Sequence, residues 1–427
     1  MSSRRVLVVG TTPDYVDIIR RRYPGRALFL TDERMRLEAS EETPGPEEEV
    51  TFDLRDARGS AEALSGHLVR YDIELSGLTC YDDESLILAS DLADRWKLPF
   101  HSLEAVRTSR SKFHSKRAWL RSGVCCPRSL TARDRDDLET VMDKLGFPLV
   151  LKPLTGSGSE LVFWCRKRED ARKAFRIITR RLANHTDDRM YRSFSPPGRG
   201  LDPRQDVVLE EGFTGPEFSC DFVLSGHRAQ LVRLSGKILA PEIGTGTALL
   251  YYVADMEETG ISQRDLEAQL RNSASSMGFE QGIFMADFIV HRGRPYFLEV
   301  SARPAGDCLP WLVKASSGID TLGLALDVAE GRTIFLPKLE SHEFLAAFRM
   351  FARREGLLQN LANGRLQTDP KVLEVVFYRK PGHRVALPPD DYFSRVLGHV
   401  VFRPGDRSRL SEEGACLEEL AEVEIAS

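Results

Sequence analysis

Residues 284–307 read FMADFIVHRGRPYFLEVSARPAGD, and this stretch decides the predicted fold. Apolar and aromatic residues alternate around single polar ones in 284–290 and again in 295–301, a pattern typical of β-strands. Between the two runs, Gly293 accepts a positive φ without steric cost, which favours a tight turn. The sequence therefore predicts a β-hairpin whose strands pair with each other.

The hairpin brings two acidic side chains together. Asp287 and Glu299 fall on one face, where two carboxylates repel each other and their pKa values rise unless a cation lies between them. A hard divalent ion such as Mg²⁺ takes oxygen ligands and stabilises such a pair. Arg303 follows, with a guanidinium suited to a phosphate or acyl-phosphate oxygen. The pattern suggests a metal and polyphosphate site, but such a stretch taken alone is more often a solvated edge hairpin with a surface ion pair, and the rest of the chain is needed to favour the metal site.

The composition describes an ordinary globular protein. With 427 residues the chain is too long for one core and predicts about three domains. Its net charge of −5 disfavours a nucleic-acid partner. The seven cysteines show no CxxC spacing and indicate reduced thiols, while no apolar run approaches membrane-spanning length. We therefore expect a cytoplasmic protein with no membrane partner.

The first part of the chain predicts a small α/β domain. Apolar runs at 6–9, 27–30, 50–54 and 75–78 alternate with helical patterns, which favours a Rossmann-like parallel sheet over residues 1–105. No GxGxxG follows the first strand, so a dinucleotide fingerprint is absent.

A basic helix opens the second part. Residues 108–123 predict one helix that ends at a glycine, with Pro127 just beyond it. Lys112, Lys116 and Arg117 share one face of this helix. Such a face is most often a solvated surface, and that is our interpretation.

A strand and a glycine loop follow. Lys152 interrupts the apolar run of 147–153, where a buried lysine requires a partner such as an anionic ligand. The next residues, LTGSGSE at 154–160, place glycines and hydroxyls in a tight loop that can point backbone N–H groups at phosphate oxygens, although most such hairpins are structural. The lysine precedes the glycines, so the loop is not a Walker A motif. Residues 184–206, rich in proline and glycine, predict a mobile loop.

Further polar residues lie on the strands that precede the hairpin. A strand–turn–strand pattern places Glu210 and Glu217 on either side of its turn, within reach of an amine or a ribose hydroxyl. Arg233, Lys237 and Glu242 come between this pattern and the hairpin. From that position alone, we expect them to line a pocket for a substrate acid or amine.

The last part predicts a smaller mixed unit. Strands are expected at 372–378 and 397–402, and a helix at 411–420. The unit has no evident chemical constellation, so we expect a covering role or a dimerising one that forms a homodimer.

The order of these segments resembles the ATP-grasp superfamily of carboxylate–amine ligases, and the last unit is similar to the accessory domain of the L-amino-acid (dipeptide) ligases. The family's lysine helix matches 112–127, its lysine strand and glycine loop match 147–159, and its adenine hinge matches 208–217. The family's metal pattern Glu-x-Asn-x-Arg-x-x-Gly matches 299–306. The resemblance implies an α/β (α+β) ATP-grasp fold in three parts: an N-terminal domain at 1–105, the ATP-grasp domain at 106–336 with a lid at 147–206, and a C-terminal domain at 337–427.

The resemblance also implies a role for each matching residue. Two lysines contact the α- and β-phosphates, the glycine loop closes over the triphosphate, and the hinge holds adenine and ribose. Acidic residues bridge Mg²⁺, with Mn²⁺ as a substitute, and an arginine holds the transferring phosphoryl group. The implied ATP-binding residues are Lys112, Lys152, Gly156, Ser157, Gly158, Ser159, Glu210, Glu211, Phe213 and Glu217; the metal-binding residues are Asp287, Glu299 and Ser301; the catalytic residue is Arg303.

The implied activity is an ADP-forming ligase. ATP transfers its γ-phosphoryl group to a small-molecule carboxylate, and a small-molecule amine displaces phosphate to form an amide or peptide bond. One position departs from the family: Ser301 stands where asparagine is usual, and a hydroxyl is a shorter and poorer metal ligand. This leaves open a nucleotide-binding module without that chemistry, and a bicarbonate-activating carboxylase-type relative is a third hypothesis.

Overall fold

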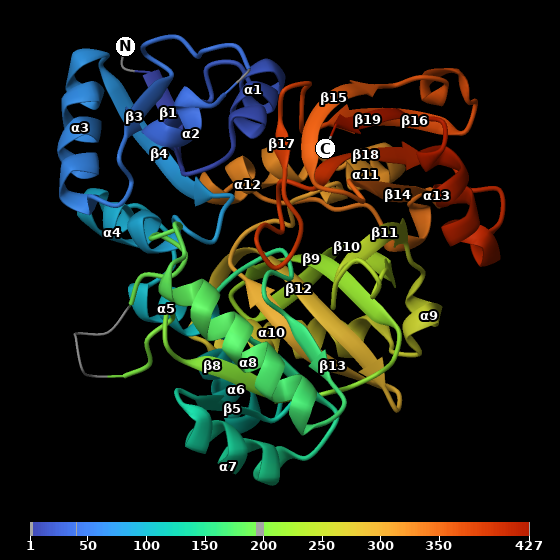
Figure 1. Cartoon of the computed structure of the whole chain (residues 1–427). Helices are drawn as coiled ribbons and strands as arrows, with labels where there is room; N and C mark the ends of the chain where they lie inside the picture. Colours follow the sequence, from blue (N-terminus) through green and yellow to red (C-terminus); the bar gives the residue numbers. More distant parts are fainter. Residues whose placement is uncertain (1–2, 40, 194–199, 427) are drawn as a thin grey trace.

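The structure is a computed structural model, and it describes residues 3–39, 41–193 and 200–426. The predicted loop at 184–206 therefore lies partly outside the described residues, at 194–199. Figure 1 shows the N-terminal part in blue, a green-to-yellow centre and an orange-to-red C-terminal part, packed against one another. Within the described residues, no helix combines the length and apolar character needed to cross a lipid bilayer.

The N-terminal part is a parallel sheet flanked by helices. Its strand order is β3-β2-β1-β4, and all neighbours run parallel. The apolar run of β1 ends in four buried residues and β2 is buried throughout, because helices cover both faces of such a sheet. The predicted parallel sheet is confirmed. Its elements are β1 (Ser3–Val9), α1 (Pro13–Arg22), β2 (Ala27–Asp32), α2 (Glu33–Leu37), β3 (Glu49–Phe52), α3 (Ala57–Arg70), β4 (Ile73–Cys80) and α4 (Leu86–Trp96).

The next segment forms a four-stranded antiparallel sheet with the order β5-β8-β6-β7, which we call the lid sheet. Helices α7 and α8 share its hydrophobic core. The elements of this segment are α5 (Leu103–Arg110), α6 (Lys112–Arg121), β5 (Ser129–Ala132), α7 (Arg135–Leu145), β6 (Leu149–Pro153), β7 (Phe163–Cys165), α8 (Arg168–Ala183) and β8 (Val207–Glu211).

The single helix predicted over 108–123 is wrong. The structure has two helices that meet at Ser111, which leaves the helical conformation with ψ 107°. The Ser111 side chain accepts a hydrogen bond from the backbone N–H of His114 and so caps α6. Local capping by a serine therefore overrides the continuous helical pattern and places Lys112 in the first turn of a new helix.

The centre of the molecule is an eight-stranded antiparallel sheet with the order β13-β12-β9-β10-β11-β14-β18-β16. The predicted hairpin is confirmed as β12 and β13, joined by Arg292 and Gly293 with φ of 50° and 71°. Two positive φ values are the signature of a type I′ turn. The first elements of this region are β9 (Glu217–Ser225), β10 (Arg228–Leu239), β11 (Ala248–Val253), α9 (Met256–Thr259), α10 (Gln263–Ser276), β12 (Gln281–His291), β13 (Arg294–Ser301), α11 (Leu309–Ser317) and α12 (Thr321–Ala329).

The C-terminal part continues this sheet. Strand β14 pairs with β11, and β18 and β16 extend the sheet beyond it, while β17, β15 and β19 form a separate sheet. The predicted strands at 372–378 and 397–402 are confirmed as β16 and β18, and the helix as α13. The division of the chain at residues 105 and 336 stays a prediction. The elements are η1 (Leu339–Ser341), β14 (Ala346–Phe351), β15 (Gly356–Ala362), η2 (Leu366–Thr368), β16 (Val372–Phe377), β17 (Arg384–Val385), β18 (Val396–Phe402), η3 (Arg407–Arg409), α13 (Leu410–Glu418) and β19 (Glu422–Ala426).

Candidate active site

A cavity of about 770 Å³ lies between the lid sheet and the central sheet. Most of the residues that we predicted for ATP and metal line it, although they come from segments up to 187 residues apart (Lys112 to Glu299). Four predicted residues are absent from its described lining: Arg233, Glu242, Ser301 and Arg303. The predicted residues that line the cavity are Lys112, Lys152, Gly156, Ser157, Gly158, Ser159, Glu210, Glu211, Phe213, Glu217, Lys237, Asp287 and Glu299.

One end of the cavity is an apolar slot. Trp164 from β7 lies so close to Gly212 that a β-carbon there would come within 2.8 Å of the indole. Phe213 packs against Tyr296, with ring centroids 4.5 Å apart. A planar aromatic base suits such a slot, because it stacks on apolar walls and can pair with nearby backbone groups. The remaining apolar lining residues include Pro127, Phe147, Val150, Val162, Leu239, Ile289 and Leu298.

The wall next to the slot holds a buried charge cluster. Lys152 Nζ lies 2.7 Å from one carboxylate oxygen of Glu210, and Lys116 Nζ lies 3.4 Å from the other. Lys116 also donates to the backbone carbonyl of Leu298 and lies over the Trp119 ring, 4.9 Å from its centroid. The interpretation of the basic helix face as solvated is therefore wrong for Lys116, whose side chain is 0% exposed.

This cluster keeps its charges because its members neutralise one another. Burial opposes the ionisation of Glu210, but the two ammonium groups outweigh it and lower the pKa of this carboxyl. Burial also lowers the pKa of Lys116 to about 8, against the attraction of Glu210. The ionised Glu210 thus holds Lys152 at the cavity wall. The role implied for Glu210 at an adenine amino group stays a prediction, since its carboxylate here binds lysines.

Lys112 connects this wall to the glycine loop. Its Nζ donates to the Gly156 carbonyl at 2.5 Å, and its backbone N–H donates to Leu154. Within the loop, Gly156 and Gly158 have φ of 126° and 62°, which glycine adopts without strain. The loop therefore arches over the cavity with a lysine ammonium beneath it.

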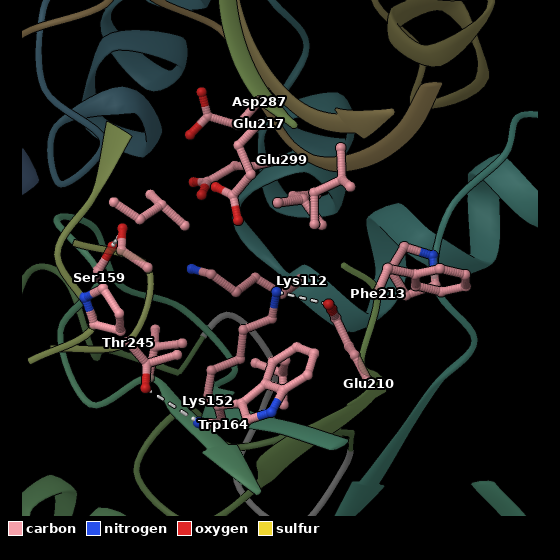
Figure 2. A pocket seen from close by; sticks show the side chains of 18 of the residues that line it. Lys112, Lys152, Ser159, Trp164, Glu210, Phe213, Glu217, Thr245, Asp287 and Glu299 are labelled. Carbon is pink, nitrogen blue, oxygen red and sulfur yellow. Dashed lines mark hydrogen bonds and ion pairs between the residues drawn. The ribbon is translucent and has the colours of Figure 1, made fainter. Parts of the chain in front are cut away.

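Three carboxylates gather on the opposite wall, facing Lys112 and Lys152 (Figure 2). Asp287 and Glu299 are direct cross-strand partners, as the hairpin pattern predicted. Oδ2 of Asp287 accepts from Lys237 Nζ at 2.6 Å, whereas its Oδ1 is buried and has no hydrogen-bond partner among the described residues. Burial raises the pKa of Glu217, Lys237 opposes this, and Asp287 reinforces it.

These carboxylates fit a divalent ion that is shared with a nucleotide. In the described part of the chain, no three histidine, cysteine, aspartate or glutamate side chains converge as a preformed metal site. Mg²⁺ is usually held by one or two carboxylates together with substrate phosphates, so a complete protein cage is not required. The Asp287–Glu299 pair, with an unpartnered oxygen on Asp287, supplies such ligands.

Ser301 and Arg303 turn toward the N-terminal part of the molecule. The Ser301 hydroxyl donates to Oδ1 of Asp83, and Arg303 donates to Oδ2 through Nε at 2.9 Å and Nη2 at 2.6 Å. Burial raises the pKa of Asp83, but Arg303 and Ser301 outweigh it, so this pKa is lowered and Asp83 is ionised. Asp83 follows β4, and its carboxylate is therefore an interdomain partner of the metal-pattern segment.

The other two predicted substrate residues have different surroundings. Arg233 is 2% exposed and donates to Asp221 at 2.7 Å and to the Ser219 carbonyl at 2.9 Å. Asp221 in turn accepts from the backbone N–H of Ala305 at 2.9 Å, so this buried pair orients the loop after Arg303. Glu242 is exposed.

Sequence reasoning missed three residues at this site. Lys116 was seen but assigned to the surface, and its spacing one turn from Lys112 was the available signal. Trp164 was given no role. Asp83 had only a weak signal, as an acidic residue just beyond a predicted parallel strand, where binding residues of such sheets collect.

Comparisons with known proteins agree with this geometry. Residues 109–185 match the RimK-like ATP-grasp domain family. The chain is 27% identical to carnosine synthase 1 of Homo sapiens over 67% of this chain and 35% of that protein. It is also 27% identical to a D-alanine–D-alanine ligase of Cupriavidus metallidurans, over 52% of this chain and 63% of that protein. The chain thus aligns with less than two thirds of the length of either relative.

A solved structure resembles the whole chain. The L-amino acid ligase of Bacillus licheniformis superposes with a TM-score of 0.77 over 100% of both chains, at 18% identity, a likeness that shows the fold. Residues 109–185 thus match an ATP-grasp domain, and the ATP-grasp fold expected from the sequence is confirmed. The relatives and the solved structure named here are ligases or synthases by name.

Proposed function

We propose that this protein activates a small-molecule carboxylate with ATP and joins it to a small-molecule amine, releasing ADP and phosphate. One observation carries the proposal: a single cavity sets two lysines and a glycine loop against the Asp287–Glu299 pair, next to an apolar slot. The names of the relatives, among them a carnosine synthase and an L-amino acid ligase, support amino acids or similar metabolites as substrates.

The residues of the cavity divide the work of holding ATP. The slot around Trp164 and Phe213 takes the base, and Lys112 and Lys152 take the phosphates, since an ammonium is a compact charge suited to phosphate oxygens. Asp287 and Glu299 hold Mg²⁺, or Mn²⁺ in its place. The ion supplies charge neutralisation at the phosphate oxygens during transfer.

Arg303 lies outside the described cavity lining, four residues after Glu299, and acts where the γ-phosphoryl group is transferred, a place that we call the transfer end. Its guanidinium neutralises the charge that develops on the transferring phosphoryl group, and the amine then displaces phosphate from the acyl-phosphate carbon. Asp83 holds Arg303 through Nε and Nη2, so the arginine is oriented before substrate arrives. A carboxylate becomes a useful electrophile only after this activation, because phosphate is a good leaving group.

A phosphate-release screen tests the proposal. The protein is incubated with ATP, Mg²⁺ and pairs from a panel of amino acids and other small acids and amines, and phosphate and product mass are measured. We expect release that depends on both an acid and an amine. ATP binding in calorimetry without release from any pair would contradict the ligase activity.

A second candidate is a nucleotide-binding module without ligase chemistry. The observation that favours it is the Ser301 hydroxyl, which binds Asp83 at the position where the family usually has asparagine. This candidate predicts tight ATP binding and no phosphate release, both for the wild type and for Ser301→Asn.

A further inference from the structure

The C-terminal part reaches back to the lid through a short segment between β17 and β18. Residues 390–395 read DDYFSR, and we call this segment the strap. Figure 1 shows the chain after β17 leaving the C-terminal sheets toward the middle of the molecule. From the sequence we expected only a covering or dimerising role for this region.

The strap is held firmly at its base. Oδ1 of Asp391 accepts from the backbone N–H groups of Phe393 at 2.7 Å and Ser394 at 3.0 Å, which fixes a tight turn. The Ser394 hydroxyl accepts from the Ala386 N–H at 3.0 Å and donates to its carbonyl at 3.1 Å. The strap therefore moves with the C-terminal part.

Its tip belongs to the lid. Tyr392 is 7% exposed and is part of the hydrophobic core that the lid sheet shares with α7 and α8. Its hydroxyl also pairs with the backbone of Leu161, two residues after the glycine loop. On the outside, Arg181 of α8 forms a 3.0 Å ion pair with Asp390. A side chain of the C-terminal part thus completes the core of the lid.

The next residue touches the glycine loop itself. Phe393 packs against Gly158, where a β-carbon would come within 2.7 Å of Cε1. The ring is still 46% exposed, so its own unit does not bury it. Gly158 lines the cavity, and the Phe393 ring therefore backs the loop that arches over the phosphates.

Arg395 reaches the other rim of the cavity. Its side chain donates to the Ile243 carbonyl at 2.8 Å. The same rim loop accepts two hydrogen bonds from the lid, from Ser159 Oγ to Gly246 at 2.9 Å and from the Trp164 N–H to Thr245 at 3.2 Å. The strap thus contacts both sides of the cavity mouth.

We propose that Tyr392 and Phe393 are positioning residues that hold the Gly156–Ser159 loop over the triphosphate, so that the C-terminal part sets the rate of nucleotide release. This inference rests on the proposed ATP-dependent function. The loop has two glycines at positive φ, so contacts from outside the loop, the Phe393 ring among them, help to keep it in one conformation.

The test is nucleotide release from Phe393→Ala. Dissociation of a fluorescent ADP analogue with Mg²⁺ is followed by stopped flow, and Kd for Mg-ATP by calorimetry. We expect release to be about three- to tenfold faster, because the loop loses the contact that backs Gly158. With a reactive substrate pair, KM for ATP should rise more than kcat falls. Phe393→Tyr keeps the ring and should restore slow release.

Two further variants keep the outcome clear. Phe335→Ala makes the same change at a ring that is 88% exposed on the segment after α12, and it should leave release unchanged. Asp390→Asn removes the outer ion pair and should speed release about twofold. A folded Phe393→Ala protein that releases ADP at the wild-type rate would contradict the proposed role of the strap but not the proposed function. A wild-type protein that binds no nucleotide would contradict both the proposed function and the proposed role of the strap.

Discussion

The cavity wall and the Arg303–Asp83 pair, which lies outside the described lining, solve the problem of buried charge in different ways. At the nucleotide end, Lys116, Glu210 and Lys152 all come from the segment that builds the lid sheet and its adjoining helices. At the transfer end, Arg303 is neutralised by Asp83, which lies 220 residues earlier and belongs to the N-terminal part. The Lys116–Glu210–Lys152 cluster is therefore formed within one segment, whereas the Arg303–Asp83 pair forms only where two parts of the chain meet.

The proposed reaction needs two steps, nucleotide binding and phosphoryl transfer, and we assign them to these two groups of residues. In the proposed reaction, the preformed cluster next to the base slot serves nucleotide binding. The Arg303–Asp83 pair is 14% and 10% exposed, and removing one partner of such a pair leaves the other charge uncompensated. Chemistry at the transfer end should therefore depend on how the N-terminal part docks, while nucleotide binding should not.

The largest effect is expected for Arg303→Met. We expect kcat of the ligase reaction to fall by about 10²–10³, the usual consequence of losing one group that stabilises transition-state charge. Kd for Mg-ATP should change less than about threefold, because the lysine cluster remains intact. Phosphate release and calorimetry on the same preparation measure the two quantities. An equal loss of ATP affinity would show that the two ends are not separate.

The contrast also explains what the sequence could reveal. Asp287 and Glu299 were predictable because strand alternation and a two-residue turn fix their register locally. Lys152 was predictable because a lysine in an apolar strand requires a buried partner. Both predictions depend only on residues that are close in the sequence to the residue concerned, within one hairpin or one strand.

The rest depends on packing between distant segments. Asp83 pairs with Arg303 across 220 residues, and no local pattern encodes how two units dock. Lys116 was misassigned because a charged helix face normally faces water, and here the face packs against Trp119 and Leu298. The role of the strap could not be predicted from the sequence for the same reason, because Tyr392 completes a core built by another part of the chain.

At the nucleotide end, Lys152→Met should weaken Mg-ATP binding by about 10- to 100-fold. A hydrogen bond to a charged group contributes about 1.5–3 kcal/mol, and tenfold in affinity corresponds to about 1.4 kcal/mol. Lys144→Met, on the exposed face of α7, is the matched control and should bind ATP normally. An unchanged affinity of Lys152→Met for Mg-ATP would mean that Lys152 pairs with Glu210 and does not contact the nucleotide.

The same cluster should leave a signature in the pH dependence of stability. The pKa of Lys116 is about 8 in the folded protein, below its ordinary value of 10.5. Between these values the unfolded chain binds more protons, so this group makes the folded state more stable as pH rises from 8 to 10.5. Relative to Lys116→Met, we expect the wild type to gain roughly 1–3 kcal/mol across this interval. Urea unfolding at several pH values measures it, and a constant difference would contradict the burial of a charged lysine.

The smallest effect is expected at Ser301, where the transfer end meets the metal pattern. Its hydroxyl donates to Asp83, so this side chain supports the partner of Arg303 instead of facing the cavity. Asparagine is one bond longer and keeps an N–H donor for Asp83 while offering a carbonyl oxygen to a metal. Ser301→Asn should therefore lower the Mg²⁺ concentration for half-maximal phosphate release by less than about tenfold.

Ser301→Ala distinguishes the two possible roles of this side chain, hydrogen bonding to Asp83 and metal binding. It removes the donor to Asp83 without adding a metal ligand, so it should lower kcat and leave the Mg²⁺ requirement unchanged. If Ser301→Ala instead raised the Mg²⁺ requirement as strongly as it lowered kcat, the hydroxyl would serve the metal directly. In that case Ser301 would not act through Asp83. The contrast between the cavity wall and the transfer end would then no longer hold at this position.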